Sequence, residues 1–311
     1  MITTLTGEND VLRQEALHRI VESFLAEHTD MGLERLDGED ADYARMLGGV
    51  QSLPFLASRK LVVLRSPGAN KEFAEHFEQF VGDIPETNDV VIVEPKLDKR
   101  LAYYKQLKKL TDFRDFAVLD AGGLERYLTD YAKTQGGSLT SGDARVLVDR
   151  IGTNQLALKH ELDKLLAYDP KITRSNIELL TERTPQSSIF ELLDAAFAGN
   201  TRRAMQLYDE QRDMRVEPQQ IIAMLVWQLH ILAIAKAAGP RSAENVAKEA
   251  KLSPFTVRKS QDLARRIGGP RLKQLITELR VFDVRLKSES ISADEVVRYY
   301  LLNLSDRDNA A

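Results

Sequence analysis

Few side chains in this 311-residue sequence have the types and spacing needed for chemistry. Nucleotide triphosphatases hold phosphate groups with a Gly-x-x-x-x-Gly-Lys-[Ser/Thr] loop that follows the first strand of a sheet. Here the matching stretch is Gly7-Glu8-Asn9-Asp10, and no Gly-Lys dipeptide occurs in the chain. The carboxylates of Glu8 and Asp10 would repel phosphate. Glu94 follows the apolar run at residues 90–93, the place of a metal-binding acidic residue in such enzymes. Without the phosphate-binding loop, we expect no ATP hydrolysis.

Other catalytic and cofactor motifs are also absent from the sequence. It contains no Gly-x-Gly-x-x-Gly and no Gly-x-Ser-x-Gly, which dinucleotide-binding proteins and serine hydrolases carry. Because there is no cysteine, disulfides, thiolate metal sites and cysteine nucleophiles are excluded. The histidines show neither an i, i+4 pair nor a His-Glu-x-x-His motif; they are His18, His28, His76, His160 and His230. We therefore expect no catalytic site, no metal and no cofactor.

Apolar residues beside a proline mark the most unusual segment, residues 48–60. Leu53, Phe55 and Leu56 lie in a connection that leads into an apolar run starting at Leu61. Two interpretations fit these residues. The loop could tuck its apolar side chains beneath the sheet edge, or it could present them as a protein interface. The residues alone favour the first interpretation.

Basic residues gather in two further stretches. The first stretch contains Lys96, Lys99, Arg100, Lys105, Lys108 and Lys109. The second contains Arg258, Lys259, Arg265, Arg266, Arg271 and Lys273. Each stretch fits a solvated helix face, with Leu101, Tyr104 and Leu107 turned inward in the first, and each also fits a basic strip near DNA or an acidic partner. The net charge is −4, and no segment is basic enough to indicate a DNA-binding protein that acts alone.

Periodicity predicts the elements that must position these residues. Continuous apolar and β-branched runs predict buried parallel strands, whereas apolar residues at helical spacing predict helices. The predicted strands are residues 2–5, 61–64, 90–93 and 113–119, with helices at 8–26, 71–81 and 98–110. Beyond Gly123 only helices are predicted, at residues 124–134, 141–151, 154–168, 174–181, 188–198, 201–214, 217–238, 242–250, 254–267, 270–287 and 292–304.

Composition places the chain among soluble globular proteins, with 43% hydrophobic and 29% charged residues. No run approaches the roughly 20 apolar residues that span a bilayer. The first residues lack the basic and apolar regions of a secretory signal. We therefore expect a cytoplasmic protein without membrane contact.

Five segments, in the same order along nearly the whole chain, resemble the delta subunit family of the bacterial DNA polymerase III clamp loader. They are LTGEN at residues 5–9, PFLASRKLV at 54–62, VEPKLDKR at 93–100, NQLAL at 154–158 and SIFELLDA at 188–195. The resemblance implies an AAA+-like α/β domain with a parallel sheet and a degenerate P-loop over residues 1–121. Two all-α domains would follow, a lid over 122–186 and a collar over 187–311.

The resemblance also implies a function. The family's subunit is non-catalytic, and it binds and opens the ring-shaped sliding clamp so that the clamp can be loaded on primed DNA during DNA replication. Carried over by position, Phe55 and Leu56 would enter a hydrophobic pocket of the clamp, and Gln51 and Leu53 would add contacts. In this context the interface becomes the favoured interpretation of residues 48–60.

The implied partners are those of the replication machinery. They are the beta sliding clamp, the gamma/tau and delta prime subunits through the collar, and primer-template DNA as part of the complex. The candidate contacts to DNA or a partner are Lys96, Lys99, Arg100, Arg265 and Arg266. ATP would act through partner subunits, so no cofactor is implied for this chain.

Three alternatives remain open. Clamp-loader proteins of the delta prime type have a cysteine-rich zinc module and a Ser-Arg-Cys motif, whereas this chain has no cysteine and Lys60 follows Ser58-Arg59. A helical adaptor for single-stranded nucleic acid would show salt-sensitive DNA binding by the isolated chain. An enzyme with a degenerate nucleotide site would be stabilised by nucleotide.

Overall fold

The computed structural model describes residues 1–54 and 57–305. The chain forms two compact units, Met1–Leu119 and Asp120–Ala311. The first unit alternates strands and helices, in the order β1 (Ile2–Thr6), α1 (Asp10–Glu27), η1 (Asp30–Gly32), β2 (Leu33–Asp37), α2 (Tyr43–Gln51), β3 (Lys60–Arg65), η2 (Pro67–Ala69), α3 (Lys71–Glu75), α4 (Phe77–Gly82), β4 (Asn88–Glu94), α5 (Ala102–Leu110) and β5 (Asp112–Asp115).

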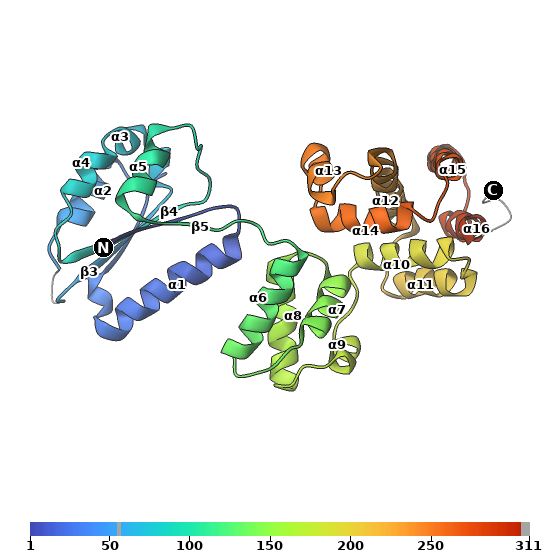
Figure 1. Ribbon diagram of the computed structural model, residues 1–311, viewed down its shortest axis with the longest axis horizontal. Coiled ribbons are helices and arrows are strands. Elements are labelled where there is room, and N and C mark those ends of the chain that lie inside the picture. The colour runs from blue at the N-terminus through green and yellow to red at the C-terminus, as the bar shows by residue number, and fades with distance from the viewer. Residues whose placement is uncertain (55–56, 306–311) are drawn as a thin grey trace. The chain divides into compact units, whose positions relative to one another are not determined.

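The five strands form one parallel sheet in the order β2-β3-β4-β1-β5. Helix α1 covers one face, where Leu17 and Phe24 pack against the side chains of Leu61 and Val91. Helices α2, α3, α4 and α5 cover the other face, as Figure 1 shows. Since both faces are covered, the inner strands are continuous apolar runs, which is why the sequence predicts them correctly.

Between Asp120 and Ser305, the described part of the second unit, all regular secondary structure is helical apart from one isolated bridge between Ser138 and Lys171. Its helices are α6 (Ala121–Thr134), α7 (Ser141–Ile151), α8 (Gln155–Tyr168), α9 (Arg174–Leu180), α10 (Pro185–Phe197), α11 (Thr201–Asp213), α12 (Pro218–Ala238), α13 (Ala243–Ala250), α14 (Pro254–Ala264), α15 (Gly269–Ser288) and α16 (Ala293–Ser305). The predicted fold class, a parallel α/β domain followed by all-α structure, is confirmed. The finer division at residues 122–186 and 187–311 stays a prediction.

The structure corrects several predicted elements. Strand β2 and helix α2 were not predicted. The predicted helix at 71–81 is interrupted at His76, where α3 ends and α4 begins. The helix predicted from residue 98 begins at Ala102, because the Asp98 carboxylate accepts the Arg100 N–H at 2.9 Å and forms a turn instead. Strand β5 ends at Asp115, four residues earlier than predicted.

Helix α12 contradicts the expectation that no segment is long and apolar enough to span a membrane. It has 21 residues and a mean hydropathy of 1.8, so by length and composition it could cross a bilayer. Its side chains Ile221, Leu225, Leu229 and Leu232 instead lie in the main core of the second unit. A core helix in contact with several neighbours is apolar around much of its circumference for the same reason as a membrane span.

Candidate functional site

The predicted contact segment, which contains Gln51, Leu53, Phe55 and Leu56, starts at the end of helix α2. Gln51 is the last residue of the helix and is exposed, and Leu53 follows it with 72% of its surface exposed. Phe55 and Leu56 lie outside the described residues. Of the two interpretations of this segment, exposure therefore holds for Leu53, and burial of this side chain beneath the sheet edge is wrong.

Two buried polar side chains fix the base of this segment. The Lys60 ammonium donates to the Gly49 carbonyl at 2.7 Å and to Ser52 Oγ at 2.5 Å, and it pairs with Glu34 at 2.6 Å. The Asn88 amide donates to the Val50 carbonyl at 2.7 Å and to the Ser52 carbonyl at 2.9 Å. These bonds satisfy carbonyls at the C-terminus of α2 that have no partner within the helix.

Lys60 and Asn88 are neighbours because they begin adjacent parallel strands, where their Cα atoms are register partners. Reasoning from the sequence missed this pairing. Lysine is almost never buried without a partner, so a lysine at the start of an apolar strand is the one signal that could have suggested it. The base of the contact segment thus lies at the end of the sheet where strands β3 and β4 begin.

Ser58 and Arg59, which lie between the contact segment and β3, are also held by polar contacts. Ser58 Oγ lies 3.1 Å from His28 Nδ1 at the end of α1, and Arg59 pairs with Asp89 at 3.0 Å. Burial alone would raise the pKa of Asp89, but hydrogen bonds from Arg59 and from the amino group of Met1 lower it overall. Both described sides of the segment are therefore tied to α1, β3 or β4.

The turn at Gly7 follows β1 at the other end of the sheet, where the strands end, and it is the place at which the sequence predicts a degenerate P-loop. Gly7 has φ of +109°, and a Cβ there would lie 2.3 Å from the Phe116 carbonyl oxygen, so only glycine fits. The Asn9 N–H donates to the same carbonyl at 2.9 Å, and the Asn9 side chain accepts from Leu12 N at 3.0 Å. The backbone N–H groups of Asn9 and Leu12 are thus used within the protein, and the Arg13 guanidinium also contacts the Gly7 carbonyl.

Glu94 has a structural role, because its buried carboxyl group accepts hydrogen bonds from two other elements of the first unit. Its Oε1 accepts the Gly68 N–H at 2.6 Å and the Tyr103 hydroxyl at 3.0 Å, and only 4% of the residue is exposed. Burial raises the pKa of Glu94, and these two hydrogen bonds offset part of the effect. The carboxylate therefore joins η2 to α5. Within the described part of the chain, no group of three or more His, Cys, Asp or Glu side chains could hold a metal ion.

We predict that Glu94 makes the stability of the first unit depend on pH. Since its folded pKa is raised, the contribution of the protonated carboxyl is fully present below the unfolded pKa and is lost as pH rises through the folded value. Denaturant unfolding at about pH 4 and about pH 8 should show wild-type losing stability relative to Glu94→Gln as pH rises. The exposed Glu78→Gln variant is the control. An equal difference at both pH values would contradict the assignment.

The predicted basic contacts are exposed, and most are paired with carboxylates. Arg100 pairs with Asp98 at 2.6 Å and Lys99 approaches Asp115 at 3.8 Å. In the second unit, Arg265 pairs with Asp262, and Arg266 pairs with Asp194 at 2.6 Å. Lys96 is exposed and lines the same pocket as the turn at Gly7. Lys96, Lys99 and Arg100 belong to the first compact unit, and Arg265 and Arg266 belong to the second.

Two residues of the basic stretches differ from expectation. Leu101 is 55% exposed rather than turned inward, because it precedes the first turn of α5 instead of lying within the helix. Arg271 is 8% exposed, and its guanidinium donates to the Asn303 carbonyl, so it belongs to the packing of α15 against α16.

Comparison with known proteins gives a consistent result. The family model described as DNA polymerase III, delta subunit, matches residues 4–115, and a second model, which describes the C-terminal domain of the same family, matches residues 186–304. DNA polymerase III subunit delta of Bacillus subtilis is 24% identical, over 98% of this chain and 92% of that protein. The solved structure of the Bacillus subtilis DNA clamp loader delta protein has a TM-score of 0.76 at 23% identity, covering 98% of this chain and 95% of that chain.

Proposed function

The chain belongs to the DNA polymerase III delta subunit family, and from this premise we propose that it is the clamp-loader subunit that binds and opens the ring-shaped sliding clamp. The two matched regions lie on either side of residues 116–185 and together include the contact segment and the C-terminal helices. The opened clamp would be loaded on primed DNA during replication, so the protein would act in the cytoplasm.

The observation that carries this proposal is the fixed base of the contact segment. Lys60 and Asn88 hold the carbonyls of residues 49, 50 and 52, while Leu53 stays exposed immediately beyond them. A contact presented on a fixed base loses less conformational entropy on binding than one on a free loop. We propose that Gln51, Leu53, Phe55 and Leu56 enter the clamp from this base.

The proposed mechanism is a difference in binding free energy and involves no chemical step. A ligand opens a ring only if it binds the open form more tightly than the closed form. Burying one Phe and one Leu side chain contributes about 1.5–3 kcal/mol each. That amount can bias one weak interface of a ring. ATP would act through partner subunits that control access to the segment.

The C-terminal helices are proposed to join the gamma/tau and delta prime subunits. Side chains that could serve are large, apolar and exposed; they are Val226, Trp227, Val281, Val284, Tyr299 and Leu302. Aromatic residues such as Trp227 and Tyr299 are enriched at protein interfaces. Primer-template DNA would be contacted within the complex, with Lys96, Lys99, Arg100, Arg265 and Arg266 as candidate residues.

The direct test is equilibrium binding of the purified chain to the sliding clamp of the same organism, without ATP. Submicromolar binding with little affinity for DNA alone is expected. If the chain instead binds single-stranded DNA strongly, with an affinity that falls steeply as salt increases, the adaptor interpretation is correct. Binding to neither would contradict both.

We also predict that nucleotide leaves the stability of the chain unchanged. A ligand at 100 times its Kd raises the free energy of unfolding by about 2.7 kcal/mol. Because the turn at Gly7 is closed against Phe116, millimolar ATP with magnesium should not shift the melting temperature. A reproducible rise with ATP but not with AMP would favour the enzyme alternative.

A further inference from the structure

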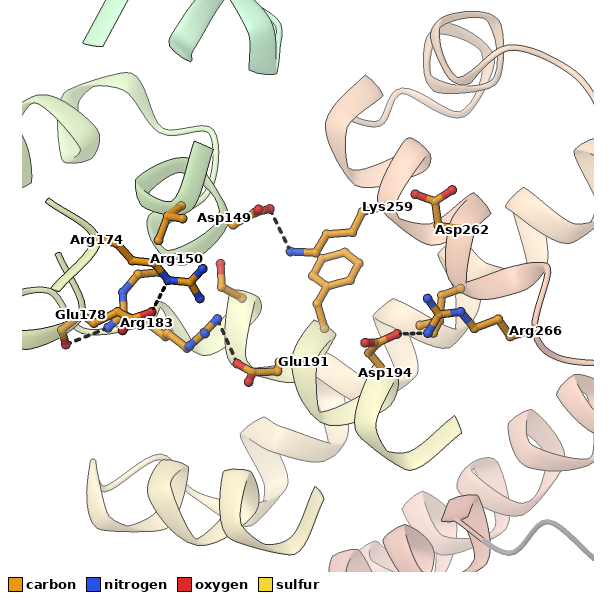
Figure 2. A pocket seen from close by; sticks show the side chains of 14 residues that line it. Asp149, Arg150, Arg174, Glu178, Arg183, Glu191, Asp194, Lys259, Asp262 and Arg266 are labelled. Atoms are coloured by element: carbon orange, nitrogen blue, oxygen red, sulfur yellow. Dashed lines mark hydrogen bonds and ion pairs between the residues drawn. The ribbon is translucent and has the colours of Figure 1, made fainter. Parts of the chain in front are cut away.

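The helices of the second unit form two groups that do not share a core. The main core contains residues from Ile189 to Leu304, contributed by α10, α11, α12, α14, α15 and α16 and the connections between them. Helices α6, α7, α8 and α9 bury a separate set of side chains, among them Leu124, Leu147, Leu158 and Ile177. Between the groups lies a cleft of about 370 Å³, lined by α7, α9, α10 and α14 (Figure 2).

Charges of both signs line this cleft in equal number. The cations are Arg150, Arg174, Arg183, Lys259 and Arg266, and the anions are Asp149, Glu178, Glu191, Asp194 and Asp262. A balanced lining has little net attraction for a charged ligand. Most of its charges instead form pairs with each other, such as Arg183 with Glu191 at 2.9 Å.

One of these pairs crosses the cleft from helix α14 to helix α7. The Lys259 ammonium lies 3.4 Å from Asp149 Oδ1, as Figure 2 shows. It also lies 5.2 Å from the centre of the Phe190 ring and 5.6 Å from that of Phe255. The aromatic faces attract the ammonium and hold it in position for the carboxylate. By contrast, the pairs Arg174–Glu178 and Arg266–Asp194 each stay on one side of the cleft.

The chain passes between the two groups at residues 181–184, and Arg150 holds this connection to α7. Its Nε donates to Thr181 Oγ1 at 2.9 Å, and its carbonyl accepts the Thr184 N–H at 3.0 Å. The connection is therefore fixed to α7 at both of its ends. Hinges are a few residues in a connection that joins two rigid bodies, and residues 181–184 join two helix groups that bury separate sets of side chains.

We propose that residues 181–184 form a hinge between helices α6–α9 and α10–α16, and that Lys259 with Asp149 forms a latch that keeps the cleft closed. The latch is partly exposed, so salt or a competing charged group from a partner can release it. Its release lets the first helix group change its angle to the second while both cores stay intact. This inference goes beyond clamp binding and does not depend on it.

The test measures the distance between α6 and α13 in the full chain. Because the chain has no cysteine, Asp130→Cys and Lys248→Cys place two spin labels at exposed sites without background labelling. Pulsed electron paramagnetic resonance should give one narrow distance distribution for the otherwise wild-type chain at low salt. Lys259→Met keeps an apolar side chain near the rings but removes the charge. We expect this variant to increase the displaced population about fivefold to tenfold.

Two further variants make the result specific. Asp149→Asn should have a similar effect, and the double variant should exceed neither single variant, since both remove the same contact. Arg258→Ala breaks a neighbouring ion pair, in which Arg258 of α14 lies 2.5 Å from Glu244 of α13. Because both helices belong to the same group, this variant should leave the distances unchanged. Melting temperatures verify that all variants fold. Unchanged distances in folded Lys259→Met, an equal effect of Arg258→Ala, or additive effects of the two latch variants would overturn the proposal.

Discussion

Replacing Phe55 and Leu56 together by alanine should weaken binding to the sliding clamp about a hundredfold or more, which corresponds to about 3 kcal/mol. The physical reason is that two adjacent apolar side chains at the centre of an interface carry a large share of the binding free energy. Isothermal titration of the clamp with the wild-type and variant chains measures the difference.

The control for this prediction is Leu101→Ala. Leu101 is also apolar and exposed, but it lies before α5, beyond the carboxyl end of β4, whereas the contact segment precedes the amino end of β3. Its replacement should leave the affinity unchanged, and both variants should melt at the wild-type temperature. If the double variant binds as tightly as wild type, Phe55 and Leu56 are not the clamp contacts.

The second large effect concerns stability. Lys60→Met should lower the free energy of unfolding by about 3 kcal/mol, because it leaves Glu34 and the Gly49 carbonyl without their cation. Lys71→Met is the matched control, since Lys71 is 90% exposed in its pair with Glu75 and should contribute less than about 0.5 kcal/mol. Urea unfolding of both variants measures these values.

The same Lys60→Met variant should also weaken clamp binding, because the base of the contact segment loses its fixed carbonyls. The loss should be smaller than that caused by changing Phe55 and Leu56. A stability equal to wild type would show that Lys60 does not fix the segment. A lowered stability with unchanged clamp affinity would show that the fixed base does not matter for binding.

The buried strands could be predicted because their signal is local. Strands β3 and β4 each contain an uninterrupted run of four Val, Leu or Ile residues, which is typical of a sheet covered on both faces. Strand β2 could not be predicted in this way. It is an edge strand with the sequence LERLD, in which three of the five residues are charged, and only pairing with β3 makes it a strand.

The residues of the candidate site differ in the same way: some have a local signal in the sequence, and others depend on tertiary contacts. Gln51, Leu53, Phe55 and Leu56 could be proposed from the sequence because the segment resembles that of a known family. The residues that fix the segment could not, since Asn88 and Ser52 are 36 residues apart in the chain and meet only through the register of β3 and β4. The place of Glu94 after an apolar run is visible in the sequence, but its hydrogen bonds to Gly68 and Tyr103 depend on tertiary contacts.

The central claim is that this chain opens the clamp as well as binding it, and one measurement tests it most directly. A donor and an acceptor fluorophore are placed on opposite sides of one interface of the clamp ring, and energy transfer is followed as the chain is added without ATP. We predict that wild type lowers the energy transfer to a plateau, whereas Phe55→Ala/Leu56→Ala does not at the same concentration. Saturated binding of wild type with unchanged energy transfer would contradict the claim, because the chain would then hold the clamp without opening it.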